Sequence, residues 1–183
     1  MKRTTLTCLL FLTLTMSTVP AGAHEFLAST TGKTTIKILA TSIFTTAAGK
    51  AECTGATLLE GEVKSLKATT LTSTVQFTGC KAFGLAATVS PAKFKTTAEG
   101  NVSLLKTATV KAPACLVTIP SVKNQNLGTI KYKNTNKGIE KVASGTAITS
   151  EGTGTACSYA QESKGTFQGD ALVNLIGGTL DWK

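Results

Sequence analysis

Residues 167–175 read FQGDALVNL. Apolar side chains fall on alternate positions of this stretch: Phe167, Ala171, Val173 and Leu175. Three of the four intervening positions carry polar side chains, Gln168, Asp170 and Asn174, and the fourth is Leu172. Alternation with a period of two is typical of a β-strand that buries one face and exposes the other. The stretch therefore predicts a strand with one face in a core and one face in water.

The same alternation recurs in short runs along the chain: Ile36 and Ile38, Val75 and Phe77, Val117 and Ile119, and Ile130 and Tyr132. Turn-forming residues separate the runs, among them Gly32, Gly49, Gly79, Gly84, Gly100, Pro113, Pro120 and Gly177. Such a pattern predicts an all-β fold, an antiparallel sandwich or a barrel-like domain of many short strands. Residues 59–66 also fit helical spacing, but Gly61 weakens a helix, and we predict a strand there.

The composition agrees with a β-rich globular chain. The 183 residues are 42% hydrophobic and only 16% charged, which excludes a disordered chain. Thirty-four threonines are scattered among the apolar residues, and threonine favours strands. Glu, Lys and Leu repeats are missing, which excludes a coiled coil.

The first 23 residues have the pattern of a cleaved signal peptide. Lys2 and Arg3 precede an apolar run over residues 6–19, and Ala21-Gly22-Ala23 matches the small-residue cleavage pattern. We predict a helical signal peptide over 1–23, then a single β-rich domain over 24–183, with possible halves 24–112 and 113–183. No later segment has the ~20 apolar residues of a membrane span. The mature protein is therefore expected to be secreted and extracellular.

The predicted mature chain is basic through lysine alone. Seventeen lysines and ten acidic residues remain, a net charge of +7, and Arg3 was the only arginine. Lys93 and Lys95 flank Phe94, as Lys131 and Lys133 flank Tyr132, which predicts the solvent face of strands. Such lysines could attract anionic or polysaccharide envelope material. Nucleic-acid binding is not expected, because bidentate recognition of phosphate and guanine depends mainly on arginine.

Four cysteines remain after removal of the signal peptide: Cys53, Cys80, Cys115 and Cys157. An even number in an exported chain predicts two disulfides, for which three pairings are possible. We favour Cys53–Cys80 and Cys115–Cys157, since neighbours in sequence pair most simply. Each bridge would contribute on the order of 3–4 kcal/mol by constraining the unfolded chain. No spacing is CxxC, so neither zinc nor thioredoxin-type chemistry is favoured.

Several segments together resemble a known group of proteins. These are His24-Glu-Phe, the segments 44–53, 74–84 and 114–120, and Gly165-Thr-Phe-Gln-Gly169 after Cys157. They are similar to secreted, threonine-rich, cysteine-paired β-rich proteins of soil actinobacteria, to which no activity is assigned. Members often carry extra cysteines where this sequence has none, over roughly residues 89–105. The resemblance implies a disulfide-bonded, exported β-fold and names no function.

The sequence contains few residues that could form a catalytic or metal site. His24 is the only histidine, so a two-histidine copper site and a Ser-His-Asp triad both lack a partner. Glu60 and Glu62 would lie roughly 7 Å apart on one face of a strand, a spacing compatible with glycoside hydrolysis. Lys64 continues the same face, which is more typical of a solvated surface. We predict no catalytic residue, no metal site, no cofactor and no enzymatic activity, with a glycoside hydrolase as a remote alternative.

The sequence does not specify a ligand. It favours a non-enzymatic exported domain with a structural or surface-interaction role. The alternative is a carbohydrate- or cell-wall-binding module, in which Tyr132, Tyr159 and Trp182 would be the candidate stacking residues.

Overall fold

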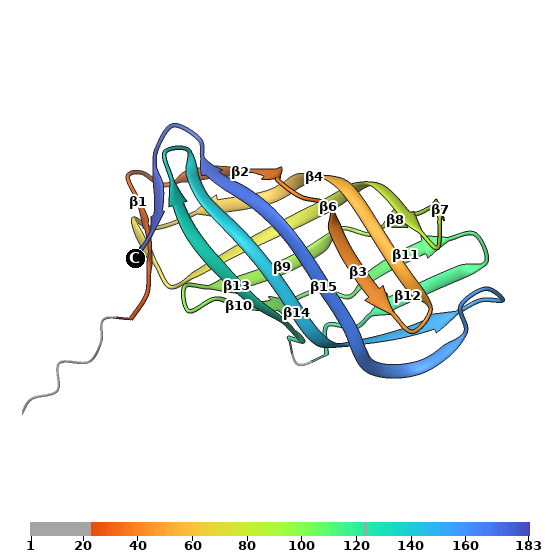
Figure 1. Ribbon diagram of the computed structural model, residues 1–183. Coiled ribbons are helices and arrows are strands. Elements are labelled where there is room, and N and C mark those ends of the chain that lie inside the picture. The colour runs from red at the N-terminus through yellow and green to blue at the C-terminus, as the bar shows by residue number, and fades with distance from the viewer. Residues whose placement is uncertain (1–22, 123) are drawn as a thin grey trace, which may run out of the picture.

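The computed structural model describes residues 23–122 and 124–183, and the predicted signal peptide lies almost wholly outside them. The described residues form sixteen strands and no helix (Figure 1). The strands are β1 (Phe26–Ala28), β2 (Gly32–Ile38), β3 (Ser42–Thr46), β4 (Gly49–Val63), β5 (Lys67–Ala68), β6 (Thr70–Ala82), β7 (Leu85–Ala86), β8 (Thr88–Val89), β9 (Ala92–Thr97), β10 (Asn101–Leu104), β11 (Ala108–Ala112), β12 (Cys115–Ile119), β13 (Asn126–Thr135), β14 (Gly138–Thr153), β15 (Tyr159–Leu175) and β16 (Leu180–Trp182). The all-β prediction is confirmed, including the strand assignment up to Val63.

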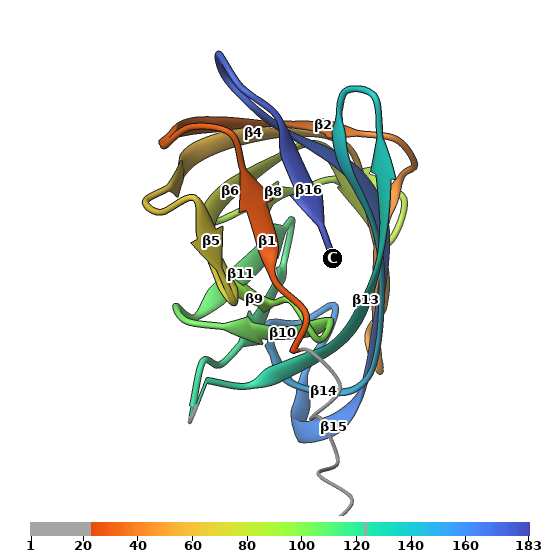
Figure 2. The same cartoon turned by 90° about the vertical axis from the view of Figure 1, so that its left-hand side faces the viewer.

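The main sheet is antiparallel and closes on itself. Its hydrogen-bonded order is β15-β3-β4-β6-β9-β10-β13-β14, and β14 pairs again with β15. β2 and β3 share one position of this ring, since β2 pairs with residues 171–175 and β3 with residues 166–168 of β15. Opposite walls face each other across one interior, so the fold combines the barrel-like closure with the face-to-face packing of a sandwich (Figures 1 and 2).

The predicted alternation sets which side chains enter this interior. Phe167 lines it and Val173 is buried, while Gln168 between them is exposed. Lys131 and Lys133 are exposed on either side of Tyr132, which packs inward. On β13 the period of two therefore places the apolar side of the strand inward and Lys131 and Lys133 outward, as expected.

Two disulfides cross-link the sheet as predicted, Cys53–Cys80 and Cys115–Cys157. The first joins register partners on β4 and β6. The second ties the start of β12 to the connection between β14 and β15. The loops that they close, with sequence separations of 27 and 42, correspond to about 3.5–4 kcal/mol each. Two disulfides are compatible with an extracellular protein.

The two ends of the closed sheet differ. At one end a separate three-stranded sheet, β16-β1-β5, lies across the opening (Figure 2). We call β1, β5 and β16 the end sheet; it contributes the buried side chains of Phe26 and Leu180. The opposite end carries β7, β8, β11 and β12 (Figure 1), and we call it the stapled end because Cys115–Cys157 lies there. The sequence around Pro113 forms the tight turn between β11 and β12, with Ala114 at φ 56°.

Candidate functional site: an apolar cavity with one lysine

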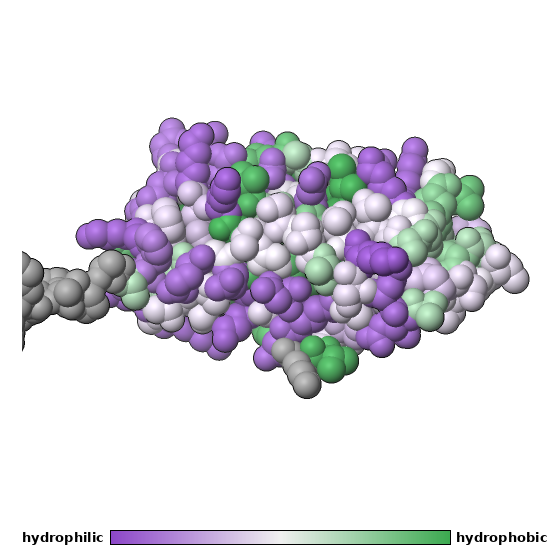
Figure 3. Space-filling model, turned by 60° about the horizontal axis from the view of Figure 1, so that its bottom comes forward, coloured by the Kyte–Doolittle hydropathy of each residue, from purple (hydrophilic) through white to green (hydrophobic). Residues whose placement is uncertain are grey.

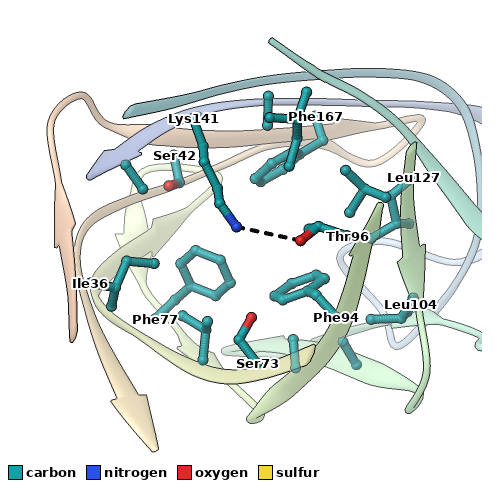
Figure 4. Close-up of a pocket in the computed structure, with 18 of the residues that line it drawn as sticks. Ile36, Ser42, Ser73, Phe77, Phe94, Thr96, Leu104, Leu127, Lys141 and Phe167 are labelled. Carbon is teal, nitrogen blue, oxygen red and sulfur yellow. Dashed lines mark hydrogen bonds between the residues drawn. The ribbon is translucent and has the colours of Figure 1, made fainter. Parts of the chain in front are cut away.

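A cavity of about 180 Å³ lies inside the closed sheet. Most of its lining is aliphatic and aromatic (Figure 4): Ile36, Phe77, Phe94, Leu104, Leu127 and Phe167. Engineered apolar cavities of ~150 Å³ in other proteins bind benzene. Closed sheets of about eight strands have an interior just wide enough for side chains or one small ligand. The interior is therefore large enough for a small organic molecule.

Small residues on one wall create this space. Ala143 and Gly169 are register partners on β14 and β15, and Ala171 is the partner of Lys141. All four residues line the cavity, and three of them are no larger than alanine. A Cβ atom at Gly169 would lie 3.1 Å from Ser42 Oγ, so even an alanine there would crowd the neighbouring strand. The large rings of Phe77 and Phe94 come from β6 and β9 on the opposite wall and leave the gap open.

Among the described residues, Lys141 is the one basic residue that lines the cavity, and its amino group points into it (Figure 4). Its Nζ donates a hydrogen bond to Thr96 Oγ1 at 3.4 Å. The ring centroids of Phe26 and Tyr132 lie 5.7 and 5.8 Å from Nζ. None of the ion pairs within the described ranges includes Lys141. Burial lowers the pKa of Lys141 to about 8, because the charged form loses hydration.

Tyr132 is the register partner of Lys141 on β13 and connects the cavity to the end sheet. Its hydroxyl donates to Thr97 O at 2.6 Å, and its ring packs edge-on against Phe26 at 5.3 Å. Burial raises the pKa of Tyr132 to about 12, so its hydroxyl stays neutral at physiological pH. Tyr132 is thus a neutral neighbour of the lysine.

The three candidate stacking residues are divided between the two ends of the fold. Tyr132 and Trp182 lie together, with ring centroids 5.5 Å apart, and both are half-buried. His24 stacks on Trp182 at 4.7 Å. Tyr159 packs beside the stapled end and shares a 3.0 Å hydrogen bond with Ser150. Sugar stacking stays a prediction, and a platform of all three rings is not formed.

Glu60 and Glu62 are both exposed and border an open groove with Glu25 and several lysines. Glu60 accepts hydrogen bonds from Thr74 at 2.7 Å and from Lys93 at 3.5 Å. The bond from Thr74 and the charge of Lys93 lower the pKa of Glu60. A lowered pKa is opposite to the raised pKa that suits the general acid of a glycosidase. The residues in the described ranges include no group of three or more metal-ligating side chains.

The face in Figure 3 carries hydrophilic residues along most of its length, with apolar residues gathered at its right-hand end and in smaller groups elsewhere. The exposed large hydrophobic residues come from many separate strands and turns: Leu39, Leu59, Leu66, Leu85, Leu116, Val122, Val142 and Ile176. Scattered apolar residues of this kind are normal on a protein surface. The interior cavity is thus a better defined site than the face in Figure 3.

Comparisons with protein-family models, curated proteins and solved structures find no match for this chain. The resemblance to secreted actinobacterial proteins therefore stays a prediction. Within the part of the chain that is described, no helix has the length and hydropathy needed to cross a membrane.

Sequence reasoning missed Lys141. The local sequence Ile139-Glu-Lys-Val-Ala143 does not alternate cleanly, although in a strand the lysine shares a face with Ile139 and Ala143. Val142, on the other face of the strand, is apolar as well, so the sequence allowed either face to be the buried one. Buried Ile139 settles the choice, and it places the lysine inside.

Proposed function

We propose that this protein is an exported, non-enzymatic binding protein that holds one small apolar molecule inside its closed sheet. The observation that supports this most directly is the cavity of about 180 Å³ with an apolar lining and a few convergent polar groups. That combination is typical of small-molecule sites. The two disulfides and the signal-peptide pattern support export.

The cavity changes the preferred role of the domain. Sequence alone favoured a structural or surface-interaction protein with no small-molecule site. A purely structural domain gains nothing from an internal gap, because its lining residues lose packing contacts. The gap depends on Ala143 and Ala171, which stand at inward positions where valine or leucine would add buried apolar area. We therefore place ligand binding first.

Wild-type protein titrated with benzene and with indole tests the proposal. We expect saturable binding with a Kd on the order of 0.1–1 mM, as few ligand atoms are buried. Calorimetry and ligand-induced NMR shifts of Phe77 and Phe94 would measure it. Ala143→Leu should abolish binding by filling the cavity.

Val142→Leu is the matched control, since it enlarges the adjacent, outward-facing residue on the same strand. It should bind as wild type does. Absence of binding in wild type, or equal binding in wild type and folded Ala143→Leu, would contradict the proposal.

A further inference from the structure

The cavity contains an amino group whose hydrogen-bonding capacity is largely unused. A lysine ammonium carries three N–H donors. Lys141 Nζ uses one of them, toward Thr96 Oγ1 at 3.4 Å. Thr96 Oγ1 itself donates to Leu71 O, also at 3.4 Å. The amine is therefore free to donate to a further acceptor within the cavity.

The surroundings of the amine leave its charge uncompensated. The contacts to Nζ come from Thr96 on β9, Phe26 on β1 and Tyr132 on β13. The register partner on β15 is Ala171. Two acidic residues also border the cavity, Glu62 and Asp170, and neither forms an ion pair with Lys141 in the described chain. Asp170 is the register partner of Val142, so its side chain is on the outward-facing parity.

The polar lining offers few cationic donors. Ser42, Ser73 and Thr96 add hydroxyl groups around the same space (Figure 4), and Thr34, Thr72, Thr129 and Ser144 also line it, but Lys141 is the only cation among the described residues of the lining. One ammonium with neutral hydroxyl groups suits a singly charged acceptor. A phosphate, with up to two charges, usually needs several cationic or backbone donors. Charge complementarity thus favours a carboxylate.

We propose that the ligand is a small carboxylic acid, whose carboxylate accepts a hydrogen bond from Lys141 Nζ. Its apolar tail lies among the rings of Phe77, Phe94 and Phe167, which line the same cavity. This inference rests on the proposed function, since it names the class of ligand for that same site. The volume limits the tail to a short aliphatic chain or a single ring.

The test compares ligands that share a tail: hexanoate, 1-hexanol and hexylamine, each titrated into wild-type protein at pH 7. Hexanoate should bind at least about ten-fold more tightly than 1-hexanol, as charge-assisted hydrogen bonds are the stronger ones. Hexylamine should bind most weakly. In Lys141→Met the preference for hexanoate should disappear while 1-hexanol still binds.

Lys131→Met is the matched control. It removes the same charge from the outer face of β13, where Lys131 is the register partner of Val142. This variant should keep the wild-type preference for hexanoate.

A second measurement needs no variant. Hexanoate labelled with ¹³C at the carboxyl group should titrate with a lower pKa when bound to wild type than when free, because the ammonium stabilises the carboxylate. A raised pKa would indicate an apolar surrounding without the amine and would overturn the inference.

The outcomes separate the two proposals. If 1-hexanol and hexanoate bind equally, or hexylamine binds best, the carboxylate inference fails and the binding function stands. If no ligand binds, the proposed function fails and the inference fails with it. Loss of the hexanoate preference in Lys131→Met would also overturn the assignment to Lys141.

Discussion

The two ends of the closed sheet are secured by different means. At the stapled end, Cys115 and Cys157 are bonded covalently among small buried residues such as Ala51, Ala82 and Ala112. At the opposite end, the end sheet is held by packing and hydrogen bonds. Trp182 Nε1 donates to Ala98 O at 2.7 Å, and the backbones of Glu25 and Lys183 exchange two hydrogen bonds of 2.9 Å.

This difference has consequences for opening. A covalent bridge holds until it is reduced, whereas strands of three residues such as β1 and β16 can separate by local unfolding. The amine of Lys141 lies next to Phe26 and Tyr132, beneath the end sheet. The end sheet can thus open without the breaking of a covalent bond, and it is the end sheet that covers the amino group of Lys141.

The largest expected effect is at the stapled end. Replacing Cys115 and Cys157 together by alanine should lower the free energy of unfolding by about 4 kcal/mol, because the unfolded chain is no longer cross-linked over 42 residues. Denaturant unfolding measures the loss. Hydrogen exchange should accelerate in β11 and β12 and change little in β1 and β16. Equal acceleration of hydrogen exchange at both ends would contradict the view that the disulfide secures the stapled end alone.

The next effect is a pH dependence beneath the end sheet. Lys141 has a folded pKa of about 8 against an ordinary value of 10.5, so between these values the unfolded chain binds more protons. The stability therefore rises with pH from about 8, by up to about 3 kcal/mol. Tyr132, with its pKa raised from 10.0 to about 12, acts oppositely, since above pH 10 the unfolded chain loses its proton first.

Chemical denaturation between pH 7 and pH 10 would measure this rise. Lys141→Met should abolish it and should stabilise the protein at pH 7, whereas Lys131→Met should keep it. A flat profile in wild type would show that the amine is hydrated in the folded state.

A smaller effect is expected from the aromatic contacts of the end sheet. Trp182→Ala should lower the free energy of unfolding by about 2 kcal/mol. This is less than the loss for a fully buried tryptophan, because Trp182 is half-buried. Hydrogen exchange should accelerate in β1 and β16 and stay unchanged in β11 and β12. Trp182→Phe removes chiefly the hydrogen bond to Ala98 O and should lower the free energy of unfolding by about 1 kcal/mol.

The smallest effect is expected for Tyr132→Phe. It removes the hydroxyl that donates to Thr97 O at 2.6 Å and leaves the ring in place, so the loss should be about 1 kcal/mol or less. The fall in stability above pH 10 should become smaller as well. Unchanged stability at both pH 7 and pH 11 would show that this hydrogen bond does not help to hold the end sheet.

Much of the fold could be predicted from local sequence. Alternation identified the strands containing Phe77, Tyr132 and Val173, and the preference for cysteines that are neighbours in sequence favoured the pairs that the structure contains. Both signals depend on neighbours along the chain. The candidate site could not be predicted in this way, because its lining comes from many strands and Lys141 lies on a segment with apolar residues on both faces of the strand.

The sequence by itself determined the all-β class of fold, the presence of four cysteines able to form two disulfides, and the strand face on which most side chains turn to the interior. The structure selected the favoured pairs among the three possible ones. The tertiary structure alone decided that the sheet closes through β14 and β15, and that Ala143, Gly169 and Ala171 meet on one wall around Lys141. The physical reason is that an internal volume is the space left between opposite walls. It depends on the size of side chains that are far apart in the sequence.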